Sequence, residues 1–364
     1  MRTDILLNVT LLIFLLSGSI CQSEELLCQT DLGTLGGTNS LANGINDAGQ
    51  IVGWAHTGGD VPHAFLYQNG EMQDLGTLGD GSKSFAYAIN GVGLIVGGSD
   101  TPGGLFHAVR WQQNGDMVDL GTLGGSNSEA FGINDAGQIV GAADTTLGGE
   151  SHAVLWQQNG DKIDLDTLGS GTVSVALSIN NAGQIVGWSD IAPKPDDKDK
   201  PPPDSHAFLY QGEEMVDLGT LDGIGDSAAL WINDAGQIVG VSDTLDGESH
   251  AVLWQQNGEM VDMVDLGTLG GNSSKANAIN NTGQIVGGLD TPGGLFHAYR
   301  RQTNGEMLDL GTLGDGSESE AFGINDAGQI VGVSNITPDV EGAFHAFATS
   351  RCSKGLPGVM LLLD

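Results

Sequence analysis

The chain has 364 residues, of which 59 are glycine, and a formal net charge of −34 from 46 acidic and 12 basic side chains. The glycines follow no Gly-X-Y period, which excludes collagen, and the charge opposes binding to nucleic acid phosphates or anionic lipid headgroups. Two interpretations of the charge remain, namely solubility and capture of calcium by Asp side chains in Gly-rich loops.

Residues 1–21 have the pattern of a secretory signal peptide. Arg2 supplies an early positive charge, an apolar run extends from Leu11 to Leu16, and small residues at 17–19 precede Cys21. The apolar run is too short to remain in a bilayer as a spanning helix. We therefore expect a secreted, extracellular protein without membrane insertion.

Short motifs recur seven times between residues 31 and 349, at steps of 43 to 54 residues. Such a period is the signature of a repeat architecture in which each unit packs on its neighbours. The motif DLGTLG or a variant begins at Asp31, Asp74, Asp119, Asp164, Asp217, Asp265 and Asp309. An Ile-Asn motif places Asn46, Asn90, Asn134, Asn180, Asn233, Asn280 and Asn325, and a His-Ala motif places His63, His107, His152, His206, His250, His297 and His345.

Each unit has the pattern of four short strands. In the first unit we expect strands at 41–46, 50–55, 63–67 and 72–78, separated by Asn, Asp and Gly residues that favour tight turns. Leu75 and Leu78 break the alternation of the last strand and predict a bulge near Gly76. Four antiparallel strands in a unit of ~45 residues are typical of a propeller blade. The sequence therefore predicts an all-β, seven-bladed β-propeller of four-stranded antiparallel blades, with a β-helix as the alternative.

The two ends of the repeat array complement each other. The array begins with a fourth strand at 31–35 and ends after a third strand at 345–349. We expect the N-terminal strand to pair with the last blade and close the ring, which removes two open sheet edges. Superposed on the first unit, Cys28 and Cys352 fall on adjacent positions of the missing hairpin turn, so we expect a disulfide there, as an extracellular location permits.

The His-Ala-Phe triplets at His63, His206 and His345, together with DLGTLGG and IND-GQIVG, resemble the HAF-repeat family of extracellular proteins. The resemblance covers residues 31–349, although other units carry His-Ala-Val or His-Ala-Tyr instead. It implies export and a β-rich repeat fold. It implies no substrate and no catalytic residues.

The recurrent polar residues are expected to be architectural. A metal needs three or four ligands at one point, whereas one histidine in each blade places the seven imidazoles far apart around a ring. We expect each imidazole to bind loop backbone near a strand end, and each Asn of the Ile-Asn motif to stabilise a turn.

The loops between second and third strands vary most, and they share a face with the loops that join blades. Five carboxylates follow the second strand and are candidate ligand-binding residues: Asp100, Asp144, Asp190, Asp243 and Asp290. This acidic, Gly-rich face fits calcium or sugar binding as well as simple solvation. The Pro-rich loop 191–204 is expected to be exposed and extended, either as a tolerated insertion or as a partner-docking arm.

Trp231 is the largest departure from the seven-fold repeat. The corresponding residues in the other units are Gly44, Ala88, Gly132, Ser178, Ala278 and Gly323. On the innermost strand, this indole could fill a packing gap in the central channel or stack on a ligand, so Trp231 is a further candidate ligand-binding residue.

The sequence contains no nucleophile elbow, metalloprotease motif, phosphate-binding loop or dinucleotide fingerprint. We therefore expect a non-catalytic binding module, folded over residues 22–352 and followed by a tail at 353–364, that recognises a glycan or an extracellular protein surface. Calcium is a possible cofactor. The alternatives are a structural surface or matrix protein and a propeller glycosidase or lyase.

Overall fold

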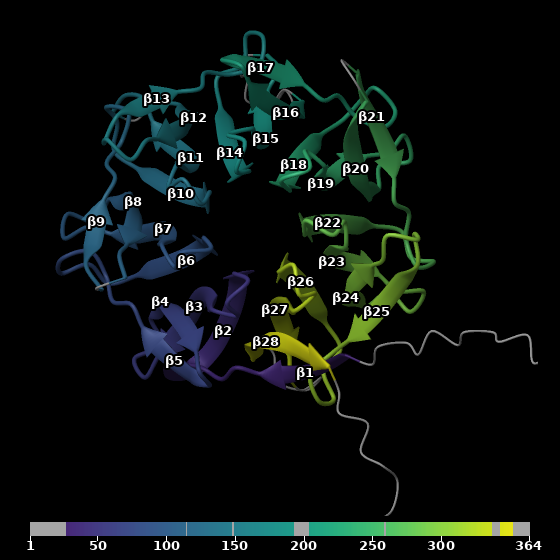
Figure 1. Cartoon of the computed structure of the whole chain (residues 1–364), viewed down its shortest axis with the longest axis horizontal. Helices are drawn as coiled ribbons and strands as arrows, with labels where there is room; N and C mark the ends of the chain where they lie inside the picture. Colours follow the sequence, from purple (N-terminus) through teal and green to yellow (C-terminus); the bar gives the residue numbers. More distant parts are fainter. Residues whose placement is uncertain are drawn as a thin grey trace, which may run out of the picture.

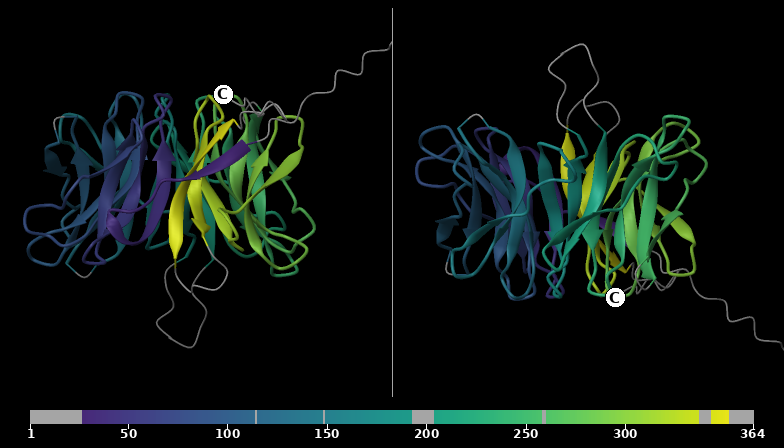
Figure 2. Two further views of the ribbon diagram at one scale, coloured as in Figure 1. Left: turned by 90° about the horizontal axis from the view of Figure 1, so that it is seen from below. Right: turned by 90° about the horizontal axis from the view of Figure 1, so that it is seen from above.

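The computed structural model describes residues 27–113, 115–147, 149–192, 204–257, 260–336 and 343–351. These residues form seven four-stranded antiparallel sheets arranged as blades around a central axis, and they contain no helix (Figure 1). Seen from the side, the ring has loops gathered at its two faces (Figure 2). The predicted seven-bladed β-propeller is confirmed. The predicted signal peptide 1–21, the tail 353–364 and residues 193–203 of the Pro-rich loop lie outside the described residues.

The blades follow one another along the chain, and each runs outward from an inner first strand. Blade 1 comprises β2 (Gly36–Ile45), β3 (Ile51–Thr57), β4 (Pro62–Gln68) and β5 (Glu71–Asp74). Blade 2 comprises β6 (Ser84–Ile89), β7 (Ile95–Asp100), β8 (Phe106–Trp111) and β9 (Met117–Asp119), and blade 3 comprises β10 (Ser128–Ile133), β11 (Ile139–Asp144), β12 (Ser151–Trp156) and β13 (Lys162–Asp164).

The remaining blades repeat this order, except that the last one combines both ends of the array. Blade 4 comprises β14 (Ser174–Ile179), β15 (Ile185–Asp190), β16 (Ser205–Gln211) and β17 (Glu214–Asp217), and blade 5 comprises β18 (Ser227–Ile232), β19 (Ile238–Asp243), β20 (Ser249–Asn257) and β21 (Met260–Asp265). Blade 6 comprises β22 (Ser274–Ile279), β23 (Ile285–Asp290), β24 (Phe296–Arg301) and β25 (Met307–Gly311), and blade 7 comprises β26 (Ser319–Ile324), β27 (Ile330–Asn335), β28 (Phe344–Arg351) and β1 (Leu27–Asp31).

The invariant glycine of the second strand allows the inner strand to bulge. In blade 1 the register between β2 and β3 shifts between Ala42 and Gly44. A Cβ added to Gly53 would lie 1.9 Å from the carbonyl oxygen of Leu41, which no side chain could tolerate. The bulge breaks strict alternation in the inner strand, as bulges do in other sheets.

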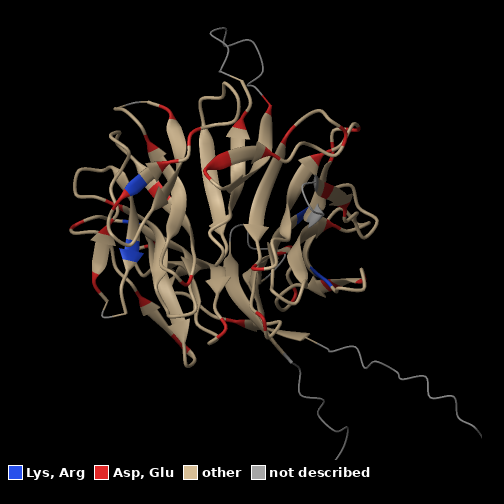
Figure 3. Ribbon diagram, turned by 45° about the horizontal axis from the view of Figure 1, so that its top comes forward, with Lys and Arg blue, Asp and Glu red and all other residues tan. Residues whose placement is uncertain are grey.

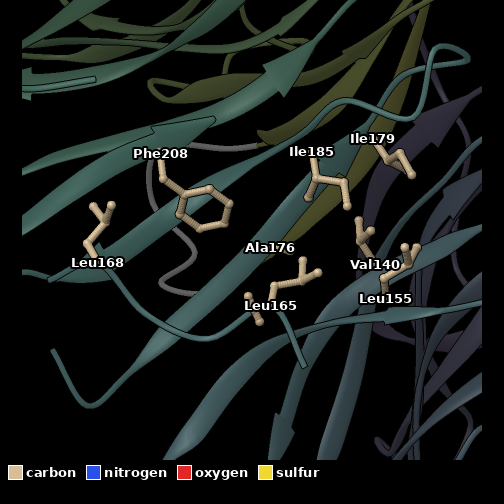
Figure 4. Packing of buried hydrophobic residues seen from close by; sticks show 9 residues of the cluster. Val140, Leu155, Leu165, Leu168, Ala176, Ile179, Ile185 and Phe208 are labelled. Carbon is tan, nitrogen blue, oxygen red and sulfur yellow. The ribbon is translucent and has the colours of Figure 1, made fainter. Parts of the chain in front are cut away.

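The hydrophobic core lies between neighbouring blades. Figure 4 shows the cluster between blades 3 and 4, in which Val140 and Leu155 face Ile185 and Phe208. Leu165 and Leu168, from the loop that joins the two blades, belong to the same cluster (Figure 4). The leucines of the DLGTLG motif therefore seal an interface between blades.

The fourth strand of blade 1 ends earlier than the sequence predicts. We expected the first one to reach Leu78 with a bulge near Gly76, whereas β5 ends at Asp74. The Asp74 carboxylate accepts a hydrogen bond of 2.8 Å from the amide of Gly76, whose φ is +70°. The Leu75 amide still donates to the Ala64 carbonyl of β4 at 2.9 Å, and the side-chain turn ends the ladder at Gly76, because the Gly76 amide binds the carboxylate instead of the sheet.

The predicted ring closure is confirmed, although the pairing strand is shifted toward the N-terminus. β1 pairs with β28 in antiparallel register from Leu27 opposite Arg351 to Asp31 opposite Phe347. The expected strand at 31–35 is wrong for the same reason as in blade 1, because the Asp31 carboxylate binds the amide of Gly33 at 2.7 Å. Cys28 lies opposite Ser350. Cys352 lies outside the described residues, so the disulfide stays a prediction.

Candidate functional site

Each histidine of the His-Ala motif pairs with an aspartate of its own blade. The Nδ1 atom lies 2.7 to 3.0 Å from the carboxylate of the Asp that ends the fourth strand. The pairs are His63–Asp74, His107–Asp119, His152–Asp164, His206–Asp217, His250–Asp265, His297–Asp309 and His345–Asp31. A carboxylate only accepts, so Nδ1–H donates. The expected partner, loop backbone, is wrong, but the role is architectural.

The asparagines of the Ile-Asn motif form a closed ring around the channel. Each Nδ2 donates to the backbone carbonyl of the corresponding Asn in the next blade at 3.0 to 3.1 Å. The order of donation among the described residues is Asn46, Asn90, Asn134, Asn180, Asn233, Asn280, Asn325 and back to Asn46. These side chains are 3% to 5% exposed. The turn role that we predicted understates their function, because they also join all blades.

The residues that follow the ring asparagines form a second, outer ring at the channel mouth. In six steps among the described residues, the backbone amide of one donates to the side-chain oxygen of the next at 2.8 to 2.9 Å. The members are Asp47, Gly91, Asp135, Asn181, Asp234, Asn281 and Asp326. Gly91 has no side chain, so the Asp47 amide lacks the acceptor that its counterparts have.

Trp231 lies at this mouth. It lines a cavity of about 170 Å³ together with the Ile-Asn residues of every blade. Its side chain is partly buried and packs against two core clusters, one containing Val239 and Ile279 and the other containing Ala278 and Ile324. These contacts support the packing role that we weighed for Trp231. A role of Trp231 in ligand binding stays a prediction.

The five candidate aspartates lie at the ends of the second strands, one in each of five blades. Their carboxylates accept hydrogen bonds mainly from the loop that leads into their own blade. The contacts are Ser82 Oγ to Asp100, the Asn127 amide to Asp144, Ser205 Oγ to Asp190, the Asp226 amide to Asp243 and the Ser273 amide to Asp290. The structure does not bring these carboxylates together, and it places Trp231 near the opposite face.

One of them, Asp243, lines a pocket between blades 4 and 5. The pocket has a volume of about 260 Å³. Its lining residues are Trp188, Ser205, Asp226, Ser227, Ala228, Val241, Asp243 and Ser249. The pocket therefore combines one aromatic wall with two carboxylates and several hydroxyl groups, at the edge of the variable loop face.

The pocket lies where a large side chain of one blade meets a small side chain of the next blade. Trp188 lies on the second strand of blade 4, and the inner strand of the next blade presents the small Ala228. The same two positions between blades 1 and 2 hold Trp54 and Phe85, whose ring centroids lie 6.0 Å apart in an edge-on contact. Phe85 thus fills the space that Ala228 leaves open.

A hydrogen bond between two ionisable groups links blades 2 and 3. The Tyr87 hydroxyl donates to Glu129 at 2.5 Å, and the Tyr87 ring packs on Phe131. Burial raises the pKa of Glu129, and the hydrogen bond from Tyr87 opposes part of that rise. Burial and the adjacent Glu129 charge also raise the pKa of Tyr87.

Three further properties concern metal ions, membranes and charge. In the described part of the chain, no group of three or more His, Cys, Asp or Glu side chains is arranged to hold a metal ion. No helix of those residues has the length and apolar composition needed to cross a bilayer. Aspartates and glutamates occupy loops all around the ring, whereas Lys and Arg are few (Figure 3).

Comparison with known proteins supports the fold and leaves the family open. Residues 113–221, less than half of the chain, match a family described as "Protein of unknown function (DUF3466)". No curated protein sequence matches the chain. The predicted membership of the HAF-repeat family is wrong, because the family model that matches part of the chain is DUF3466. The His-Ala motif arises from blade geometry, since His pairs with Asp and the next Ala is fully buried, and it does not identify a family.

Several solved propellers are similar in structure. A puromycin hydrolase variant shares 12% identity with a TM-score of 0.51, over 86% of this chain and 52% of that one. TolB from Acinetobacter baumannii shares 13% identity with a TM-score of 0.45, over 79% and 76% of the two chains. A gluconolactonase from Xanthomonas campestris shares 11% identity with a TM-score of 0.43, over 88% and 90%. At such identities the similarity concerns the fold alone.

Proposed function

We propose that this propeller is a secreted, non-catalytic carbohydrate-binding protein and that the pocket between blades 4 and 5 holds the sugar. The observation that carries the proposal is the composition of the pocket. Trp188 offers an apolar surface to the C–H face of a sugar ring, and Asp226, Asp243, Ser205 and Ser249 offer acceptors and donors to its hydroxyl groups.

The size of the pocket supports a small ligand. Its volume of about 260 Å³ lies below the range of about 300–1,000 Å³ that is common for drug-sized ligands. Such a pocket fits one sugar ring, with the rest of a glycan lying along the loop face. Secretion rests on the pattern of residues 1–21.

The polar lining favours binding over acyl-transfer chemistry. The described lining residues include three serines, Ser205, Ser227 and Ser249, but no histidine, lysine or cysteine beside them. Ser249 Oγ donates to Asp243 Oδ1 at 2.8 Å, and Ser205 Oγ donates to Asp190 Oδ1 at 3.2 Å. These hydroxyls therefore orient carboxylates, and the lining supplies none of the histidine or lysine bases that usually activate a serine nucleophile.

A glycan array tests the proposal. The mature protein is screened once with calcium and once with a chelator, since calcium is the cofactor that the sequence suggests. Trp188→Ala should weaken binding by roughly tenfold or more. Trp54→Ala is the matched control, because Trp54 occupies the same strand position but faces Phe85.

Three outcomes separate the possibilities. Binding that falls in Trp188→Ala and persists in Trp54→Ala supports the site, and loss on chelation adds calcium to it. Glycan binding that both variants retain would place the sugar elsewhere. No glycan binding under either condition would overturn the proposal in favour of a protein partner or a structural role.

A further inference from the structure

We infer that the pocket between blades 4 and 5 selects a sugar that carries a protonated amine. The inference rests on the proposed function and specifies its ligand class. It starts from the two carboxylates of the pocket, Asp226 and Asp243, which come from the joining loop and from the second strand of blade 5.

The carboxylates are held in place by neutral donors. Asp226 Oδ1 accepts from the Ser205 amide at 2.7 Å. Asp243 Oδ1 accepts from Ser249 Oγ at 2.8 Å, and Asp243 Oδ2 accepts from the Asp226 amide at 3.2 Å. The two side chains are therefore ordered by hydrogen bonds, yet none of these bonds supplies a positive charge.

No basic side chain of the described residues forms an ion pair with either carboxylate. Among the described residues, ion pairs join His to Asp side chains and Lys275 to Glu320, and none of these involves Asp226 or Asp243. Asp226 is exposed, and its Oδ2 atom has no hydrogen-bond partner among the described residues. An ammonium group entering the pocket would thus form a charge-assisted hydrogen bond with an oxygen that is already oriented.

Acidic residues around the pocket add to its preference for a cation. Asp190 lies behind Ser205, and Asp222 binds the amide of Leu245 on the neighbouring loop. With a net charge of −34, the protein attracts cations and repels uronic or sialic acids before contact (Figure 3). The indole of Trp188 adds attraction for a cation close to its face.

The pocket lining contains two carboxylates, Asp226 and Asp243. The described residues contain no group of three acidic, His or Cys side chains with metal-binding geometry. A hexosamine spans several ångströms, so that its amine can meet Asp226 while its ring packs on Trp188. The spread of the polar groups therefore matches an amino sugar.

Three β1,4-linked trisaccharides, of glucosamine, N-acetylglucosamine and glucose, form a matched set of probes that differ at the C2 substituent. We expect the glucosamine trisaccharide to bind roughly tenfold more tightly than the other two in calorimetric titrations at pH 6 and low salt. The preference should shrink at high salt, because screening weakens the charge term.

Two variants remove one negative charge each. Asp226→Asn keeps the acceptor for the Ser205 amide and should abolish the preference. Asp246→Asn is the control, because Asp246 is exposed in the loop after β19 and does not line the pocket. Equal loss in both variants would show a general charge effect and overturn the inference.

The remaining outcomes distinguish this inference from the proposed function. Equal binding of the three trisaccharides, lost in Trp188→Ala, would overturn the amine preference and leave carbohydrate binding intact. Absence of binding to these probes and to every glycan of the array would overturn both.

Discussion

The side chain of Asn325 donates a hydrogen bond of 3.1 Å to the backbone carbonyl of Asn46, and this contact joins the last blade to the first. Asn46 in turn donates to Asn90, so that every blade is both donor and acceptor. Hydrogen bonds arranged in such a chain polarise one another. The propeller is therefore closed twice, once by strand pairing in blade 7 and once by this ring of asparagines.

Asn134→Ala should lower the free energy of unfolding by about 2–4 kcal/mol. The substitution removes the donor to the carbonyl of the buried Asn180 and the acceptor for the amide of the half-buried Gln138. Chemical denaturation measures the change. Asn272→Ala is the control, because Asn272 is exposed, and it should change stability by less than about 0.5 kcal/mol. Equal midpoints for the two variants would contradict a structural role for the ring.

Gly91→Asn should stabilise the protein by roughly 1 kcal/mol. The new amide oxygen would accept from the Asp47 amide and complete the outer ring. A Cβ at Gly91 lies 3.0 Å from the nearest Asp135 oxygen, so this carboxylate must move by a few tenths of an ångström. Gly91→Asp supplies the same acceptor but adds a like charge beside Asp135, and it should be less stable than Gly91→Asn, more clearly at low salt. Thermal unfolding measures the stability of both variants. A Gly91→Asp variant that is at least as stable as Gly91→Asn would refute this account.

The Tyr87–Glu129 contact should make stability depend on pH. Burial raises the pKa of Glu129 in the folded protein, so the folded state holds its proton over a range in which the unfolded chain has lost it. The contribution is favourable at acid pH and is lost as pH rises through the raised pKa. As pH rises, the wild type should therefore lose stability relative to Glu129→Gln. Glu214→Gln, at an exposed glutamate, should show no such shift.

Cys28 and Cys352 should be joined in the mature protein. Mass spectrometry after alkylation without reductant would find both thiols protected, and two alkylated cysteines would contradict the pairing. Reduction should increase amide hydrogen exchange in β1, which no hairpin turn joins to β28 and which is held by strand pairing, by the side-chain contacts of Gln29 and Asp31, and by the predicted bond. The matched strand β5 follows β4 in one continuous hairpin and should be unaffected. Chain entropy gives roughly 5 kcal/mol as an upper figure for the stabilisation.

The fold was predictable because the chain repeats its local signals seven times. The Asn-Asp-Ala-Gly turn that begins at Asn46 and the apolar strand after it fix one hairpin, and the Asn69-Gly70 turn fixes another. Closure followed from counting strands at the two ends. The end of the fourth strand in blade 1 was not predictable, because the leucines of its motif read as strand residues although the Gly76 amide binds the Asp74 carboxylate and leaves the ladder.

The candidate site was predictable only in part. Asp243 was recognised from its place after a second strand, and it does line the pocket. Trp188 and Ala228 were missed, because the pocket depends on a large residue in one blade meeting a small residue in the next. A signal existed in the sequence, since Ala228 is smaller than Phe85 at the same position of the repeat. This difference indicates a pocket only when the second strand of one blade is compared with the inner strand of the next.

Blade 7 contains the first and the last of the described strands. The ribosome releases β1 before the other described strands and β28 after them, so the ring cannot close before all of these strands have emerged. Until then the apolar face of blade 1 around Ala42 and Phe65 lacks Val331 and Ala346, which cover it in the finished protein. A nascent chain that stops before β28 therefore leaves this face bare, and quality-control factors that recognise apolar surface would meet it there.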